Sequence, residues 1–160
     1  MMEALRIDNL YKSFGKHKVI DGLSLSIPEK TIFGFLGKNG AGKTTTMKMV
    51  LGFLKIDKGT IEVFGEKVKY GQTNTNRFIG YLPDVPEFYD YMMAKEYLEL
   101  CGSITGFNKK DTINKSLELL VLVGLSGVEK RIKSFSRGMK QRLGIAQALL
   151  NSPKLLICDE

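Results

Sequence analysis

The chain has 160 residues, 43% of them hydrophobic, and a formal net charge of +7 at pH 7. That length suits one ordinary domain with enough apolar side chains to build a buried core, which excludes a disordered chain. The longest apolar-rich stretch, 117–128, is too short and too often interrupted to span a bilayer, and the first eight residues carry no signal-peptide pattern. We therefore expect a globular protein of the cytoplasm.

The positive charge comes from lysines scattered along the chain. Without a dense basic run, this pattern favours ordinary solvated surface charge, with an anionic membrane surface or nucleic acid as the alternatives. The two cysteines, Cys101 and Cys158, do not have the spacing of metal ligands. Because Cys158 lies in an apolar segment, we expect a buried, reduced thiol.

Three segments, 4–8, 19–27 and 60–64, alternate or run apolar and include β-branched residues. Glycine and proline separate them, and together they predict an antiparallel β layer. Three shorter apolar segments, 32–36, 79–82 and 155–158, lack strict alternation. Strands buried on both faces of a parallel sheet have that pattern.

Apolar residues recur at helical spacing in 44–54 and twice within 94–123. A further helix is expected from about Ser136 to Leu150, because Ser136 is a suitable N-cap and Pro153 follows its end. The only histidine, His17, is expected in a solvated turn.

Residues 37–44 read G-K-N-G-A-G-K-T, directly after the apolar segment 32–36 and before the helical pattern. This is the phosphate-loop pattern, in which backbone N–H groups converge on an anion at a helix N-terminus. Lys43 supplies a charge, and the Thr44 hydroxyl is a ligand suited to Mg²⁺. The residues predicted to bind nucleotide here are Gly37, Lys38, Asn39, Gly40, Ala41, Gly42, Lys43, Thr44 and Thr45.

The apolar segment 155–158 ends in two adjacent carboxylates, Asp159 and Glu160. Together with the phosphate loop they indicate a nucleoside triphosphate site, with a magnesium ligand and a candidate base.

A third motif, F-S-R-G-M-K-Q-R at 135–142, stands shortly before that segment. The three motifs together resemble the nucleotide-binding domain of ABC transporters over the whole chain. The family signature commonly reads L-S-G-G-Q. Ser136 and Gly138 match it, while Arg137 and Met139 replace a glycine and the glutamine. These variants resemble the multidrug and bacitracin-type exporter branch.

The resemblance implies an α/β fold, with a P-loop NTPase core, an antiparallel β subdomain and a helical signature subdomain. Residues 1–83 would form the β layer and phosphate-loop core, 84–150 the mainly helical subdomain, and 151–160 a strand that returns to the core. Because the family continues beyond the catalytic glutamate, the resemblance also implies a C-terminally truncated domain with weak or no ATPase activity of its own.

The same resemblance assigns roles to single residues. Asp159 binds Mg²⁺ and Glu160 polarises the attacking water. Phe14 stacks on adenine, with Tyr11 as the competing choice. Asp84 takes the place of a glutamine that senses the membrane partner. Nearby Phe88, Tyr89 and Tyr91 form either a groove for that partner or part of the helical core.

Partners and function follow from the resemblance as well. Two domains pair head to tail, so that each ATP lies between one phosphate loop and the other domain's signature, residues 136–139. A separate membrane-spanning permease subunit completes the transporter, and ATP hydrolysis drives substrate export at the inner face of the cell membrane. No nucleic acid partner is expected in this reading. A soluble ABC ATPase acting on ribosomes or DNA and a non-catalytic nucleotide-gated module are the alternatives.

Overall fold

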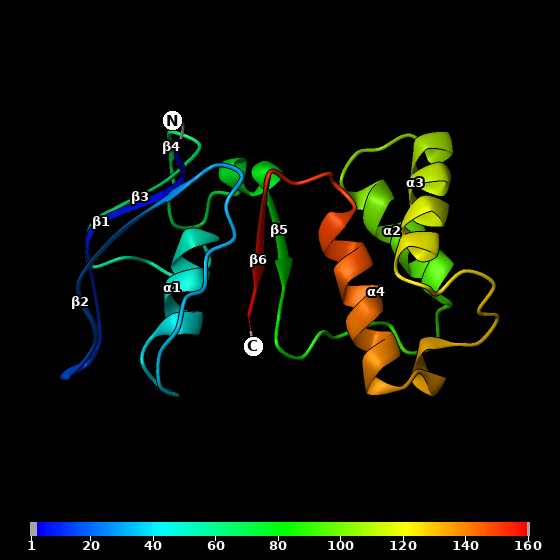
Figure 1. Ribbon diagram of the computed structural model, residues 1–160, viewed down its shortest axis with the longest axis horizontal. Helices are drawn as coiled ribbons and strands as arrows, with labels where there is room; N and C mark the ends of the chain where they lie inside the picture. The colour runs from blue at the N-terminus through cyan, green and yellow to red at the C-terminus, as the bar shows by residue number, and fades with distance from the viewer. Residues whose placement is uncertain (1–2, 160) are drawn as a thin grey trace. The chain divides into compact units, whose positions relative to one another are not determined.

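The computed structural model describes residues 3–159 (Figure 1). Two compact units divide the chain. The first comprises residues 3–79 together with Asp159, and the second comprises residues 80–158.

The first unit is built on a four-stranded antiparallel sheet with the strand order β2-β1-β3-β4. Its strands are β1 (Glu3–Phe14), β2 (His17–Pro28), β3 (Lys58–Val63) and β4 (Glu66–Lys67). This confirms the antiparallel layer expected from the sequence. His17 is exposed where β2 begins.

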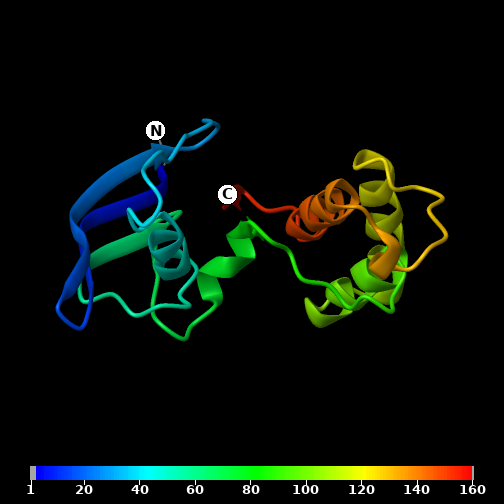
Figure 2. The same ribbon diagram turned by 90° about the horizontal axis from the view of Figure 1, so that it is seen from below.

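Helix α1 (Lys43–Val50) lies against one face of this sheet, as Figures 1 and 2 both show. Met49 and Val50 on the helix are buried, as are Ile61 and Val63 on β3. Burial of these apolar side chains is the main force that holds helix and sheet together. A short 3₁₀ helix, η1 (Asn74–Phe78), follows, and Asn76 Nδ2 donates a hydrogen bond to Leu51 O at 3.1 Å.

Residues 31–38 are not part of either sheet, so the strand expected at 32–36 is wrong for this structure. Leu36 is 93% exposed, and Ile32 is fully exposed. A strand forms only where a neighbour accepts and donates its backbone hydrogen bonds, and no described segment pairs with this one.

β5 (Ile79–Leu82), which enters the second unit at Gly80, and β6 (Leu155–Cys158) are neighbours in a two-stranded sheet and run in the same direction in Figure 1. Both strands were expected from the sequence. The buried thiol expected at Cys158 is wrong, however, because the structure exposes this residue. β6 has one described neighbour, β5, and is therefore less covered than a strand inside a wider sheet.

Three helices form the rest of this unit: α2 (Ala94–Ile104), α3 (Lys109–Leu122) and α4 (Arg137–Leu149), with a 3₁₀ turn, η2 (Ile132–Ser134), before α4. They enclose one apolar core in which Leu98, Ile132 and Leu143 are fully buried. The buried face of α3 comprises Thr112, Ser116, Leu119 and Leu120. None of the helices within residues 3–159 has the length and apolar character that a membrane span requires.

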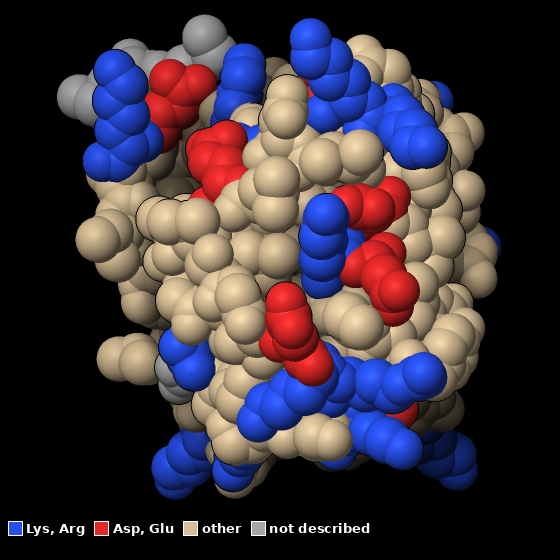
Figure 3. Space-filling model, turned by 90° about the vertical axis from the view of Figure 1, so that its right-hand side faces the viewer, with Lys and Arg blue, Asp and Glu red and all other residues tan. Residues whose placement is uncertain are grey.

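Charged side chains of both signs share the surface shown in Figure 3. Lysine and arginine gather along its upper and lower edges, with acidic side chains between them. The surface is therefore mixed in charge over this view.

Candidate nucleotide-binding site

The phosphate loop makes a tight turn directly before α1. Ala41 N donates to Lys38 O at 3.0 Å, and Gly42 has a φ of 91°. A Cβ at Gly42 would lie 3.1 to 3.2 Å from atoms of Val19 and Ile20 on β2. Both the left-handed backbone and the close approach of β2 therefore require glycine at this position.

The N-terminus of α1 faces the loop without a side-chain cap. Gly42 offers no capping side chain, and the first turn of the helix carries no acidic residue. The first N–H groups of a helix have no intrahelical acceptor, and the helix dipole is positive at this end. The arrangement suits an anion.

Lys43 folds over the loop. Its Nζ donates hydrogen bonds to Gly37 O at 2.6 Å and to Lys38 O at 3.1 Å. The ammonium therefore lies at the turn whose backbone N–H groups are predicted to hold phosphate.

Thr44 and Asp159 meet within the first unit. Thr44 Oγ1 donates a hydrogen bond to Asp159 Oδ1 at 3.1 Å, and Asp159 is only 5% exposed. The carboxylate of Asp159 thus lies at the start of α1. The other predicted acidic residue, Glu160, lies outside the described residues.

The Thr44 and Asp159 pair fits a magnesium ion. Both side chains offer oxygen, the element that Mg²⁺ prefers, and Mg²⁺ commonly keeps several waters and uses phosphate oxygens as well. Among residues 3–159 no cluster of three or more His, Cys, Asp or Glu could hold a metal. Among the described residues, this pair supplies the protein oxygens for such an ion, with water and nucleotide as further ligands.

Phe14 ends β1 and is 51% exposed, so much of its ring is accessible. Tyr11, the competing candidate for adenine stacking, is half-buried and packs against β2. A Cβ added at Gly22 would lie 3.0 Å from the Tyr11 hydroxyl oxygen. Phe14 is the more accessible of the two rings.

Two residues that the sequence reasoning missed support Phe14. Lys12 is nearly buried, and its ammonium lies 5.3 Å from the centre of the Phe14 ring. The carboxylate of Asp57 accepts hydrogen bonds from Lys12 Nζ at 3.0 Å and from Ser13 N at 2.7 Å. These two bonds, that from Lys12 first, hold the pKa of Asp57 below its usual value.

The signature segment begins α4 in the second unit. Ser136 is the N-cap residue, and its Oγ accepts a hydrogen bond from Met139 N at 3.2 Å. Arg137 and Gly138 are exposed, whereas Met139 packs partly against the helical core. The serine cap expected from the sequence is confirmed.

Asp84 is exposed in the loop after β5. Of the aromatic residues that follow, Phe88 packs edge-on against Tyr97, with ring centres 5.1 Å apart, and so belongs to the helical core. Tyr89 and Tyr91 are exposed, and their ring centres are 6.0 Å apart. Tyr89 also lies edge-on to Tyr97, with ring centres 6.3 Å apart, so the core interpretation holds for Phe88 and the partner groove stays a prediction.

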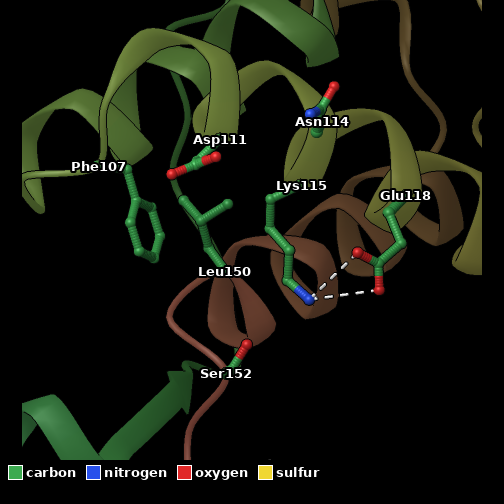
Figure 4. A pocket seen from close by; sticks show the side chains of 7 residues that line it. All are labelled: Phe107, Asp111, Asn114, Lys115, Glu118, Leu150 and Ser152. Carbon is green, nitrogen blue, oxygen red and sulfur yellow. Dashed lines mark hydrogen bonds and ion pairs between the residues drawn. The ribbon is translucent and has the colours of Figure 1, made fainter.

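A separate cavity of about 340 Å³ lies beside α3 and the end of α4 (Figure 4). Lys115 and Glu118 form an ion pair at its wall, with a closest distance of 3.3 Å. Its lining residues are Phe107, Asp111, Asn114, Lys115, Glu118, Leu150 and Ser152. None of the predicted nucleotide-site residues lines this cavity.

The glycine-rich turn before α1, with the strand-end carboxylate beside it, defines a phosphate-loop nucleotide-binding domain. A family model described as ABC transporter matches residues 20–160. The chain therefore belongs to the ABC transporter family, which confirms the family and the fold class expected from the three motifs. Domains of this family bind nucleotide and act as ATPases.

Curated relatives agree with the family. The chain is 45% identical over 98% of its length to the uncharacterized ABC transporter ATP-binding protein YxlF of Bacillus subtilis (strain 168). It is 44% identical over its whole length to the bacitracin transport ATP-binding protein BcrA of Bacillus licheniformis. Each match covers 52% of the relative, so the chain spans about half the length of these relatives.

Solved structures agree with the fold. An ATP-binding subunit of an ABC transporter has a TM-score of 0.83 and 28% identity, and the match covers 98% of this chain and 66% of that one. The ADP conformation of MJ1267, an ATP-binding cassette of an ABC transporter, has a TM-score of 0.83 and 26% identity, covering 98% of this chain and 68% of that one.

Proposed function

We propose that this chain is the ATP-binding part of an ABC transporter that couples ATP binding and hydrolysis to substrate export through a separate membrane subunit. The observation that carries the proposal is the hydrogen bond between Thr44 and Asp159, which brings the phosphate loop and the strand-end carboxylate into one site. The similarity to BcrA, named as a bacitracin transport ATP-binding protein, supports a role in transport.

In this proposal the loop 37–42 and Lys43 bind the β- and γ-phosphates. The amide groups at the start of α1 and the Lys43 ammonium supply the positive potential. Thr44 and Asp159 hold Mg²⁺, which neutralises phosphate charge when it is bound. Phe14 stacks on the adenine ring.

Hydrolysis then needs an oriented water molecule. Glu160 accepts a proton from this water while the water oxygen attacks the γ-phosphorus. The bond between that phosphorus and the bridging oxygen then breaks, which releases ADP and phosphate. Phosphoryl transfer depends mainly on positioning and charge stabilisation, and these groups are of the types that the reaction requires.

The signature segment 136–139 serves a second copy of the domain. The α4 N-terminus, with Arg137 exposed beside it, offers amide groups and positive charge to an ATP bound by the other copy in a head-to-tail dimer. Asp84 and the exposed Tyr89 and Tyr91 are proposed to face the membrane subunit. The protein would then work at the cytoplasmic face of the membrane.

The phosphate-loop assignment is tested by ATP titration of Lys43→Ala against the parent chain. Affinity should fall strongly, because the side chain that neutralises the phosphates is removed. Lys48→Ala is the matched control, since Lys48 is an exposed lysine on the same helix. Equal loss in both variants, or no loss in Lys43→Ala, would contradict the assignment.

The role of Glu160 is tested in the protein at the full length of its relatives. Glu160→Gln should still bind ATP but hydrolyse it far more slowly, since the amide cannot take the proton. Unchanged turnover would remove Glu160 as the base.

A further inference from the structure

Lys12, on strand β1, is only 8% exposed, which is unusual for a lysine. Its ammonium donates hydrogen bonds to Lys55 O at 2.8 Å and to Asp57 Oδ1 at 3.0 Å. A buried ammonium is costly unless it is paired and hydrogen-bonded. Burying an apolar side chain here would cost less free energy, so a charge at this position suggests a role beyond packing.

Besides these two oxygens, the Lys12 ammonium lies close to the Phe14 ring. A lysine has three N–H donors, and two of them are used by the oxygens of Lys55 and Asp57. Its Nζ lies over the Phe14 ring at 5.3 Å from the centroid, within the range of a cation–π contact. Half of the Phe14 surface nevertheless stays exposed.

Asp57 bonds to three consecutive residues near the end of β1, Tyr11, Lys12 and Ser13, and we call this set of bonds the clamp. Its Oδ2 accepts from Ser13 N at 2.7 Å, and its own N–H donates to Tyr11 O at 3.1 Å. The segment that leads into β3 therefore holds both residues that flank Lys12. Asp57 therefore holds both the ammonium beside the Phe14 ring and the backbone that leads to Phe14.

We propose that Lys12 is a positioning residue for the nucleotide base, because its ammonium, held by Asp57, fixes the Phe14 ring and polarises it for stacking on adenine. The cation draws the π electrons of the ring toward itself, which makes the opposite face a better partner for an electron-rich purine. This inference rests on the proposed function, in which Phe14 stacks on the base.

The test compares ATP with inorganic tripolyphosphate, which carries the phosphates without the base. In the full chain, Lys12→Met keeps most of the apolar stem and removes the charge. ATP affinity should fall about threefold to tenfold, whereas tripolyphosphate affinity should not change. Lys18→Met, which alters an exposed lysine on β2, should change neither affinity.

Epistasis with Phe14 separates positioning from a structural role. Phe14→Ala should weaken ATP and not tripolyphosphate, and adding Lys12→Met to Phe14→Ala should then cause no further loss of ATP affinity. A structural role would weaken tripolyphosphate as well, or would weaken ATP by the same factor with and without Phe14. Either result would overturn the inference.

Two further outcomes separate this inference from the proposed function. If Phe14→Ala weakens ATP but Lys12→Met does not, the inference fails and the stacking role stands. If the parent binds ATP no better than tripolyphosphate, or Phe14→Ala has no effect, the stacking role and the inference fail together.

Should Lys12→Met fail to fold, Asp57→Asn makes the same comparison. It removes the counter-charge at an exposed site and should weaken ATP about twofold to threefold with tripolyphosphate unchanged; equal ATP affinity would overturn the inference.

Discussion

Thr44 Oγ1 donates a hydrogen bond to Asp159 Oδ1 at 3.1 Å, although 115 positions separate the two residues along the chain. The contact joins the first turn of α1 to Asp159, the residue that follows β6 in the sequence. Because Asp159 is buried, its carboxylate is held in place before any ligand arrives. The two oxygens belong to the side chains that we propose as magnesium ligands.

Replacement of Thr44 should uncouple ATP binding from magnesium. Thr44→Val keeps the shape and removes the hydroxyl, so the gain in ATP affinity on adding Mg²⁺ should shrink by about tenfold, the scale seen when the support of a metal site is lost. ATP titrations with and without Mg²⁺ measure this gain. Thr60→Val, the same change at an exposed position on β3, is the control. A full magnesium effect in Thr44→Val would exclude the hydroxyl as a ligand.

Local signals in the sequence predicted much of this arrangement. The glycine-rich loop before α1 and the serine cap of α4 each depend on a few neighbouring residues, and the structure has both. The antiparallel layer also follows from patterns along single strands. Such features can be read from the sequence because their causes lie within a few residues of one another.

Features that depend on distant partners were predicted less well. Segment 32–36 has the apolar pattern of a buried strand, but a strand also needs a neighbour that no local pattern can supply. Cys158 is exposed for a related reason, since the covering of β6 depends on what pairs beside it. Lys12 was overlooked because lysine is rarely buried, and its partner Asp57 lies 45 positions away.

The cap of α4 should contribute measurable stability. Ser136→Ala removes the oxygen that accepts the Met139 N–H, so the free energy of unfolding should fall by about 1 kcal/mol. Urea unfolding measures the change. Ser126→Ala, at an exposed turn residue, is the control and should have little effect. Equal stability of the two variants would mean that water replaces the cap without cost.

Close packing between α2 and α3 should require glycine at position 102. A Cβ there would lie 2.6 Å from Thr112 Cγ2, and Thr112 is buried and β-branched, so it yields little. Gly102→Ala should destabilise the chain by about 1–3 kcal/mol in urea unfolding, despite the better helix propensity of alanine.

The matching substitution in α3 should recover part of this loss. Thr112→Ser removes the methyl group and keeps the hydroxyl that bonds to Asn108 O. In the Gly102→Ala background, it should therefore cost less than in the parent, or even stabilise. Strictly additive effects of the two substitutions would show that the helices do not meet as closely as the structure has them.

Acidification should loosen the clamp at the end of β1. Its hydrogen bonds from Lys12 and Ser13 hold the pKa of Asp57 below the ordinary 3.8, so the folded state prefers the carboxylate. The resulting stability is complete above pH 3.8 and is lost as the pH falls through the lower folded-state pKa.

The measurement compares the unfolding free energy of the parent and Asp57→Asn across this pH window. The parent should be the more stable above pH 3.8, and the difference between the two should shrink below it, because only the parent has a carboxylate to protonate at this position. In the Lys12→Met background the difference above pH 3.8 should be smaller, since the bond from Lys12 is the largest cause of the lowered pKa of Asp57. A pH-independent difference would mean that Asp57 acts through its shape and hydrogen bonds rather than its charge. The clamp would then hold Ser13 without holding the cation beside Phe14.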